Sequence, residues 1–112
     1  MKDLAPNILR QRLVIEGYPS DVITAQQINS YLSQLSTAVD MNALMEPMTH
    51  QSDKFGWAGW IHWETSGAHF YAWDDPLFFS VDIYTCKAFD VNTAVEFTKQ
   101  FFDATEIVSK SF

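Results

Sequence analysis

Residues 64–90 read ETSGAHFYAWDDPLFFSVDIYTCKAFD, and this stretch decides the fold. It contains two aromatic and β-branched runs, residues 67–73 and 78–87, which are typical of strands. The turn residues Asp-Asp-Pro at 74–76 separate the two runs. Pairing of the runs across this turn predicts a β-hairpin in the middle of the chain.

The residues on either side of the hairpin predict further strands and two helices. Thr24 begins a capping box with Gln27, and apolar residues follow it at helical spacing. Each expected helix is apolar on one side only, which predicts one α+β domain over residues 1–112, with an antiparallel or mixed sheet and both helices on one face. We expect the other strands at 8–18, 43–50, 56–64 and 104–108, and the helices at 25–39 and from Asp90 or Asn92 onward.

Alternation along the strands separates an apolar face, which should meet the helices, from a polar and aromatic face. In the strand at 56–64, Trp57 and Trp63 alternate with Trp60, which implies that both sides of this strand are buried. A polar, aromatic face of this kind is either a ligand site or a subunit interface. In the hairpin this face collects His69, Tyr71, Trp73, Asp82, Tyr84 and Cys86.

Composition excludes several classes of partner. The 112 residues carry a formal net charge of -7 and no stripe of Lys and Arg, so we expect no nucleic-acid partner. The chain lacks a signal-peptide pattern and a long apolar run, and its single cysteine fits a reducing compartment, so we expect a cytoplasmic protein without membrane contact. We expect no metal site, because His50, His62 and His69 lack the usual close ligand spacings.

The central residues resemble the S-adenosylmethionine decarboxylase proenzymes of bacteria and archaea. Members of that family typically read ESHLSIHTW, then a short turn, then VDVFTC. Without a gap, the resemblance aligns Ser66 with the family's processing serine, Trp73 with its tryptophan and Cys86 with its catalytic cysteine. The resemblance extends to the NIL opening, the segment 56–59 and the DVNTAVEF helix. It implies the family's fold, a two-layer sandwich of one sheet and two helices.

The resemblance also implies a self-processing reaction. In the family, the serine hydroxyl attacks the preceding carbonyl and converts a peptide bond into an ester. β-Elimination then cuts the chain and leaves a pyruvoyl group, which here would derive from Ser66. The pyruvoyl ketone serves as the electron sink for loss of carbon dioxide, and the resemblance makes Cys86 the residue that returns a proton.

The helper positions depart from the family pattern. The resemblance aligns Tyr71 with the family's processing histidine, Ala58 with its upstream serine and Thr65 with the glutamate before its processing serine. A phenol is a poor proton acceptor near neutral pH, so self-cleavage should be slow or absent. His69 or His62 is a candidate substitute for the missing base. An alternative register would make Thr65 the nucleophile.

Three hypotheses follow from the resemblance. The leading one is a protein of the spermidine-pathway family, uncleaved and with impaired processing, that binds S-adenosylmethionine or a related nucleoside. Trp57, Trp60 and Trp73 are its candidates for stacking and for cation–π contact with the sulfonium, and Glu64 is a further candidate ligand residue. The alternatives are an active pyruvoyl-dependent decarboxylase that cleaves itself before Ser66, and an inactive regulatory subunit of a decarboxylase. The family also implies a homodimer.

Overall fold

The computed structural model describes residues 1–112 and has the expected order of strand, helix, four strands, helix, strand. Its helices are α1 (Ala25–Ala38) and α2 (Val91–Phe101). Its strands are β1 (Gln11–Tyr18), β2 (Met48–Gln51), β3 (Trp57–Trp63), β4 (Ser66–Trp73), β5 (Phe78–Thr85) and β6 (Glu106–Ser111).

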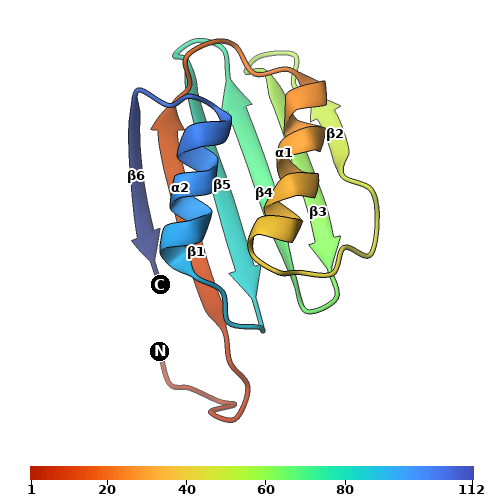
Figure 1. Ribbon diagram of the computed structural model, residues 1–112, viewed down its shortest axis with the longest axis vertical. Helices are drawn as coiled ribbons and strands as arrows, with labels where there is room; N and C mark the ends of the chain where they lie inside the picture. Colours follow the sequence, from red (N-terminus) through yellow and green to blue (C-terminus); the bar gives the residue numbers. More distant parts are fainter.

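The strands form one sheet in the order β2-β3-β4-β5-β1-β6 (Figure 1). Every neighbouring pair is antiparallel, so the mixed sheet left open by the sequence does not occur. The predicted hairpin is confirmed as β4 and β5, which pair with His69 opposite Asp82. The first strand, β1, lies between β5 and β6, so the two ends of the chain complete one side of the sheet.

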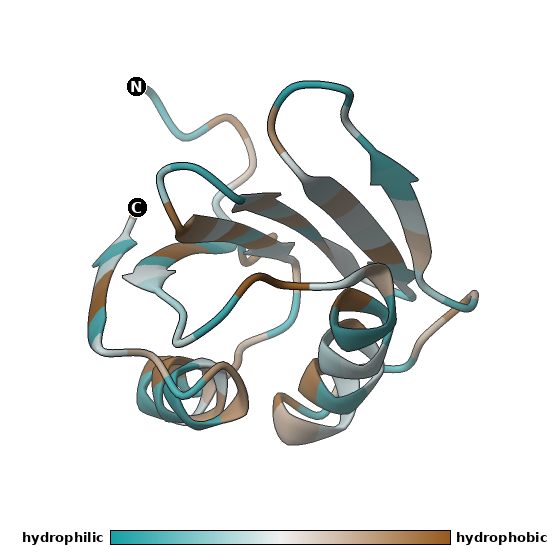
Figure 2. Cartoon of the chain, turned by 90° about the horizontal axis from the view of Figure 1, so that it is seen from above, coloured by the Kyte–Doolittle hydropathy of each residue, from teal (hydrophilic) through white to brown (hydrophobic).

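Both helices cover the same face of the sheet, as predicted (Figure 2). The covered face carries the core, in which Phe70 of β4, Val81 of β5 and Ile15 of β1 are fully buried. Helix α1 starts with the predicted capping box, because the Thr24 hydroxyl accepts from the Gln27 N–H and the Gln27 side chain accepts from the Thr24 N–H. The Asp90 side chain caps α2 by accepting from the Thr93 N–H.

Three strand boundaries differ from the prediction. The first strand starts at Gln11 and not at residue 8, because the Ile8 N–H bonds back to the Ala5 carbonyl in a turn. The segment 43–50 supplies only the short edge strand β2 and an isolated bridge from Ala43 to Trp63. The last strand is displaced to Glu106–Ser111, where side chains are mostly exposed and give no apolar pattern to read.

The opposite face of the sheet, called the open face below, carries no helix (Figure 2). It exposes 39 % of Trp60, 44 % of Tyr71 and 50 % of Tyr84. The burial expected on both sides of β3 is therefore incomplete in the single chain, whereas Trp63 on the covered face is fully buried. Neither helix is long and apolar enough to cross a membrane.

Candidate functional site

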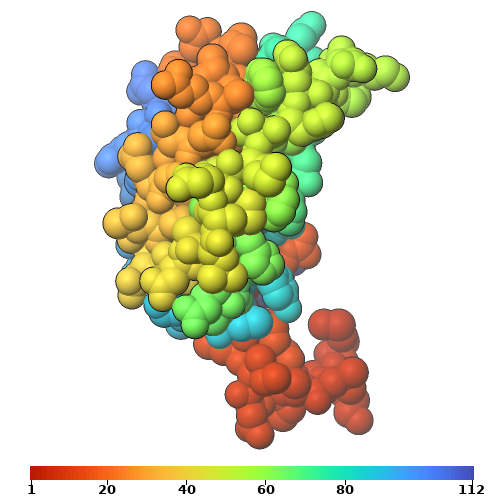
Figure 3. Space-filling model, turned by 90° about the vertical axis from the view of Figure 1, so that its right-hand side faces the viewer, coloured from red at the N-terminus to blue at the C-terminus, as the bar shows by residue number.

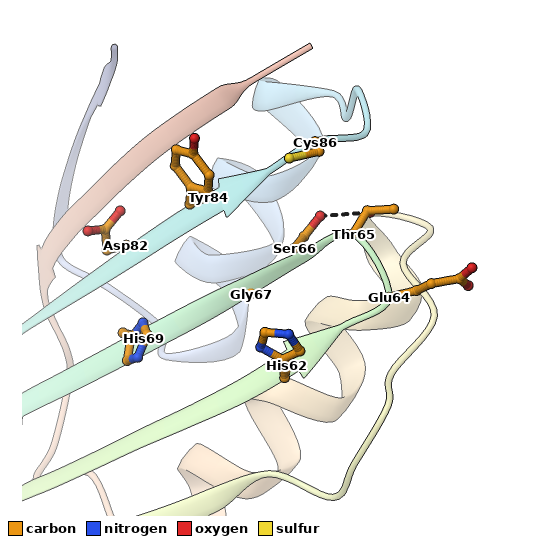
Figure 4. A pocket seen from close by; sticks show the side chains of 9 residues that line it. All are labelled: His62, Glu64, Thr65, Ser66, Gly67, His69, Asp82, Tyr84 and Cys86. Carbon is orange, nitrogen blue, oxygen red and sulfur yellow. Dashed lines mark hydrogen bonds between the residues drawn. The ribbon is translucent and has the colours of Figure 1, made fainter. Parts of the chain in front are cut away.

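A hollow of about 540 Å³ lies on the open face, at the end of the sheet where β4 begins and β5 has just ended. We call it the serine hollow. Figure 4 shows its side chains, which come from the end of β3, the turn into β4, and β4 and β5 themselves. Its lining residues are His62, Glu64, Thr65, Ser66, Gly67, His69, Asp82, Tyr84 and Cys86.

The serine hollow brings together half of the site residues predicted from the sequence. Ser66, Cys86, His69 and Glu64 line it together. By strand alternation, Ser66 belongs with the buried Ala68 on the covered face of the sheet. Cys86, just after β5, belongs with the residues of the open face. Both reach the hollow because it lies where the two strands end.

The Ser66 hydroxyl has two side-chain partners, and neither is a base. Its Oγ lies 2.9 Å from the Thr65 Oγ1, within hydrogen-bonding distance (Figure 4). It also donates to the Met41 Sδ at 3.8 Å. Met41 is 6 % exposed and belongs to the core, so the Ser66 side chain is held between a neighbouring hydroxyl and an apolar thioether. Neither group accepts a proton at neutral pH.

The carbonyl before Ser66 has a well-defined partner. The Cys86 backbone N–H donates to the Thr65 oxygen at 3.0 Å. This hydrogen bond joins the start of β4 to the residue that follows β5, beyond the last pair of the ladder, Ser66 and Thr85. A backbone N–H on a carbonyl stabilises negative charge that develops on its oxygen.

The loop after α1 fixes the turn that carries these groups. The Glu64 N–H donates to the Asn42 carbonyl at 2.9 Å, and the Asn42 amide donates to the Glu64 Oε2 at 3.3 Å. On the other side, the Lys87 ammonium donates to the Asp40 carbonyl at 2.6 Å. The loop at residues 40–42 therefore holds both the turn before Ser66 and the residue after Cys86.

Asp82, which lines the serine hollow, forms an ion pair that the sequence prediction did not include. Arg12 donates to both carboxylate oxygens of Asp82, from Nε at 3.0 Å and from Nη2 at 2.8 Å. This hydrogen bonding, followed by the charge of Asp82, raises the pKa of the Arg12 guanidinium above its usual value. Strand alternation placed Asp82 on the open face. The same rule could have placed its partner Arg12 there, because Arg12 alternates with the buried Leu13 and Ile15.

The other predicted residues lie away from the serine hollow. Trp60 stacks on His69, with ring centroids 6.4 Å apart, and so adjoins the hollow without lining it. Trp73 packs against Phe78 at the other end of the hairpin. Trp57 is half-buried against the core beneath the helices. No group of three or more His, Cys, Asp or Glu side chains is arranged to hold a metal ion.

Comparison with known proteins identifies the family. Residues 11–112 match the family described as S-adenosylmethionine decarboxylase. The chain belongs to this family. Its fold is similar to the crystal structure of the adenosylmethionine decarboxylase from Aquifex aeolicus VF5, with a TM-score of 0.77, 15% sequence identity, and coverage of 94% of this chain and 89% of that one. No curated protein sequence matches the chain.

Two departures from the S-adenosylmethionine decarboxylase pattern are direct neighbours in the sheet. Ala58 and Tyr71, which the resemblance assigns to the helper serine and histidine, pair across β3 and β4. Tyr71 lies five residues after Ser66 on one strand, which corresponds to about 17 Å. Within a single copy, position 71 is therefore too far from Ser66 for direct proton transfer.

Proposed function

We propose that this member of the S-adenosylmethionine decarboxylase family is uncleaved because the base that should activate Ser66 is missing, and that it binds S-adenosylmethionine or a related nucleoside. The observation that carries the proposal is the pair of contacts at the Ser66 hydroxyl, with Thr65 Oγ1 and Met41 Sδ. Attack on the Thr65 carbonyl requires loss of the hydroxyl proton, and neither contact takes it.

The structure offers a group that would stabilise charge on the attacked carbonyl, although it offers no contact that removes the Ser66 proton. The Cys86 N–H at 3.0 Å from the Thr65 oxygen suits the charge that attack by Ser66 would create. The family depends on a pyruvoyl group, which serves as an electron sink for decarboxylation. In this chain Ser66 would be its source, and Cys86 lines the same hollow for return of a proton.

The intact mass of the purified protein tests the proposal directly. We expect one species at the mass of the whole chain, 12.8 kDa. Two fragments separated before Ser66, with a pyruvoyl mass at the new terminus, would contradict it. Reversion of the helper pair, Ala58→Ser with Tyr71→His, should restore cleavage, and the additional change Ser66→Ala should abolish that cleavage.

The walls of the serine hollow support a cationic nucleoside as the ligand. Glu64 provides negative charge, and Trp60 and Tyr84 expose aromatic surface at or beside the hollow. A sulfonium is attracted to aromatic faces by cation–π interaction, and an adenine ring stacks on them.

Trp60→Ala should weaken binding of S-adenosylmethionine about fivefold in calorimetric titration. Phe55→Ala, which removes an aromatic ring exposed elsewhere, should leave the affinity unchanged.

We also propose that the protein is a homodimer that pairs through its open faces. The distance of about 17 Å between Tyr71 and Ser66 in one copy supports this arrangement. Any help from positions 58 and 71 must then reach Ser66 from the second copy. The single reduced Cys86 suits a cytoplasmic location for this dimer.

A second candidate function is an active pyruvoyl-dependent decarboxylase that uses a different base. Its support is the presence of His62, His69 and Glu64 around the hollow that also holds Ser66. It predicts release of carbon dioxide from S-adenosylmethionine or another amino-acid-like substrate, and loss of that release in Ser66→Ala.

A regulatory subunit is the third candidate, supported by the exposed aromatic face alone. Co-purification with a decarboxylase would favour it, and a ligand-binding homodimer would count against it.

A further inference from the structure

A second hollow, of about 690 Å³, lies beside the serine hollow and shares Tyr84 with it. The N-terminal segment forms one wall and projects from the body of the molecule (Figure 3). We call it the basic hollow. Its lining residues are Met1, Lys2, Asp3, Leu4, Arg10, Arg12, Tyr84 and Phe112.

The charge of the basic hollow is opposite to that of the whole chain. Lys2, Arg10 and Arg12 line it, and the Lys110 ammonium lies 5.1 Å from the Phe112 ring centroid. These are four of the seven basic residues in a chain with a formal net charge of -7. Asp3 is the one acidic side chain in the lining. The hollow therefore concentrates positive charge that is scarce elsewhere.

Hydrogen-bond donors in the basic hollow remain available. A guanidinium carries five N–H donors. Arg12 commits Nε and Nη2 to Asp82, which leaves Nη1. Arg10 pairs with Asp3 through Nη2, which leaves Nε and Nη1. Free guanidinium donors suit the oxygens of a phosphate group, which they bind in pairs.

Aromatic surface lies next to these donors. The Arg12 guanidinium sits 4.8 Å from the Phe112 ring centroid, so the ring is held against the cation. Phe112 is 64% exposed, which leaves ring surface free for stacking. A flat group attached to a phosphate could therefore contact both features of the hollow.

We propose that the basic hollow binds a phosphate-bearing anion, held by Arg10, Lys2 and the Nη1 of Arg12. The phosphate is either a free inorganic anion or part of a nucleoside phosphate whose ring stacks on Phe112. The residues that would hold the phosphate do not line the serine hollow, so this site does not depend on whether Ser66 is processed. The proposal therefore stands or falls independently of the function proposed above.

Calorimetric titration of the full chain with pyrophosphate and with uridine diphosphate tests the proposal. We expect both to bind, with affinities that fall as salt is raised. Arg10→Gln should weaken both about tenfold, because it removes a charged donor. Lys54→Gln removes the same charge from an exposed loop and should have no effect. Tighter binding of uridine diphosphate than of pyrophosphate identifies the nucleoside phosphate as the source, and equal binding identifies the free anion.

Two results would overturn the proposal. One is the absence of binding by both probes at low salt; if Arg10→Gln then also dissociates a dimer, the basic hollow is a contact between subunits. The other is binding that Arg10→Gln and Lys54→Gln weaken equally. Titration of Arg10→Gln with S-adenosylmethionine separates this site from the serine hollow, because that affinity should be unchanged.

Discussion

At the scale of single residues, Tyr31 of α1 shows how a polar group is accommodated in this core. Its side chain is fully buried, and its hydroxyl lies 2.7 Å from the Thr98 Oγ1 of α2. The Thr98 hydroxyl in turn donates to the Ala94 carbonyl at 2.8 Å. Burial raises the pKa of the Tyr31 phenol well above its usual value, because a tyrosinate would lose its hydration.

This pKa predicts loss of stability at high pH. Above about pH 10 the unfolded chain releases the phenol proton and the folded chain keeps it, so the free energy of unfolding falls as pH rises. Below that pH the contribution of Tyr31 is fully present. In urea unfolding between pH 9 and 11, the free energy of unfolding of Tyr31→Phe should fall less steeply with pH than that of the unchanged protein. The difference in slope should be up to about 1.4 kcal/mol per pH unit. Tyr18→Phe, which changes an exposed tyrosine, should show the same pH dependence as the unchanged protein.

At the scale of elements, the contact of α1 with β3 depends on Gly59. A Cβ on Gly59 would lie 2.4 Å from the Ile28 Cγ2. The absence of a side chain therefore lets α1 approach the sheet closely, and Ile28 is fully buried in that contact. Gly59 lies on the covered face of β3, whereas its neighbour Ala58 lies on the open face.

Gly59→Ala should therefore destabilise the fold. The added methyl group must displace Ile28 or α1, and overpacking of this kind costs about 1–3 kcal/mol. The free energy of unfolding in urea measures the loss. Ala58→Ser, on the next residue of the same strand, should change it by less than about 0.5 kcal/mol. Equal effects of the two variants would show that α1 moves aside without cost.

At the scale of the whole molecule, the uncovered sheet face predicts self-association. Trp60, Tyr71 and Tyr84 expose aromatic surface on this face, and a second copy would bury it. Light scattering should give a particle of twice the chain mass of 12.8 kDa. Tyr71→Glu should yield a monomer, because it would bury a charge in the interface. Val22→Glu, at an exposed site just before α1, should remain dimeric, and a dimer in both variants would exclude this face.

Much of the fold could be predicted because it depends on neighbours in the sequence. The capping box at Thr24, the Asp-Asp-Pro turn at 74–76 and the alternation along β4 and β5 each involve residues a few positions apart. Apart from the start of β1, which a turn at residues 5–8 delays, the strands that were misplaced are the edge strands β2 and β6. Edge strands bury little side-chain surface, so their residues show little apolar alternation.

The sequence by itself determined the element order, the helix-covered face and the presence of Ser66 and Cys86 in one hairpin, because side-chain periodicity is local. Only the tertiary structure decided what surrounds Ser66. The Met41 contact, the Cys86 N–H on the Thr65 carbonyl and the Arg12–Asp82 pair join residues 21 to 70 positions apart. Such contacts arise when strands and loops from distant parts of the chain pack together, and no short pattern encodes them.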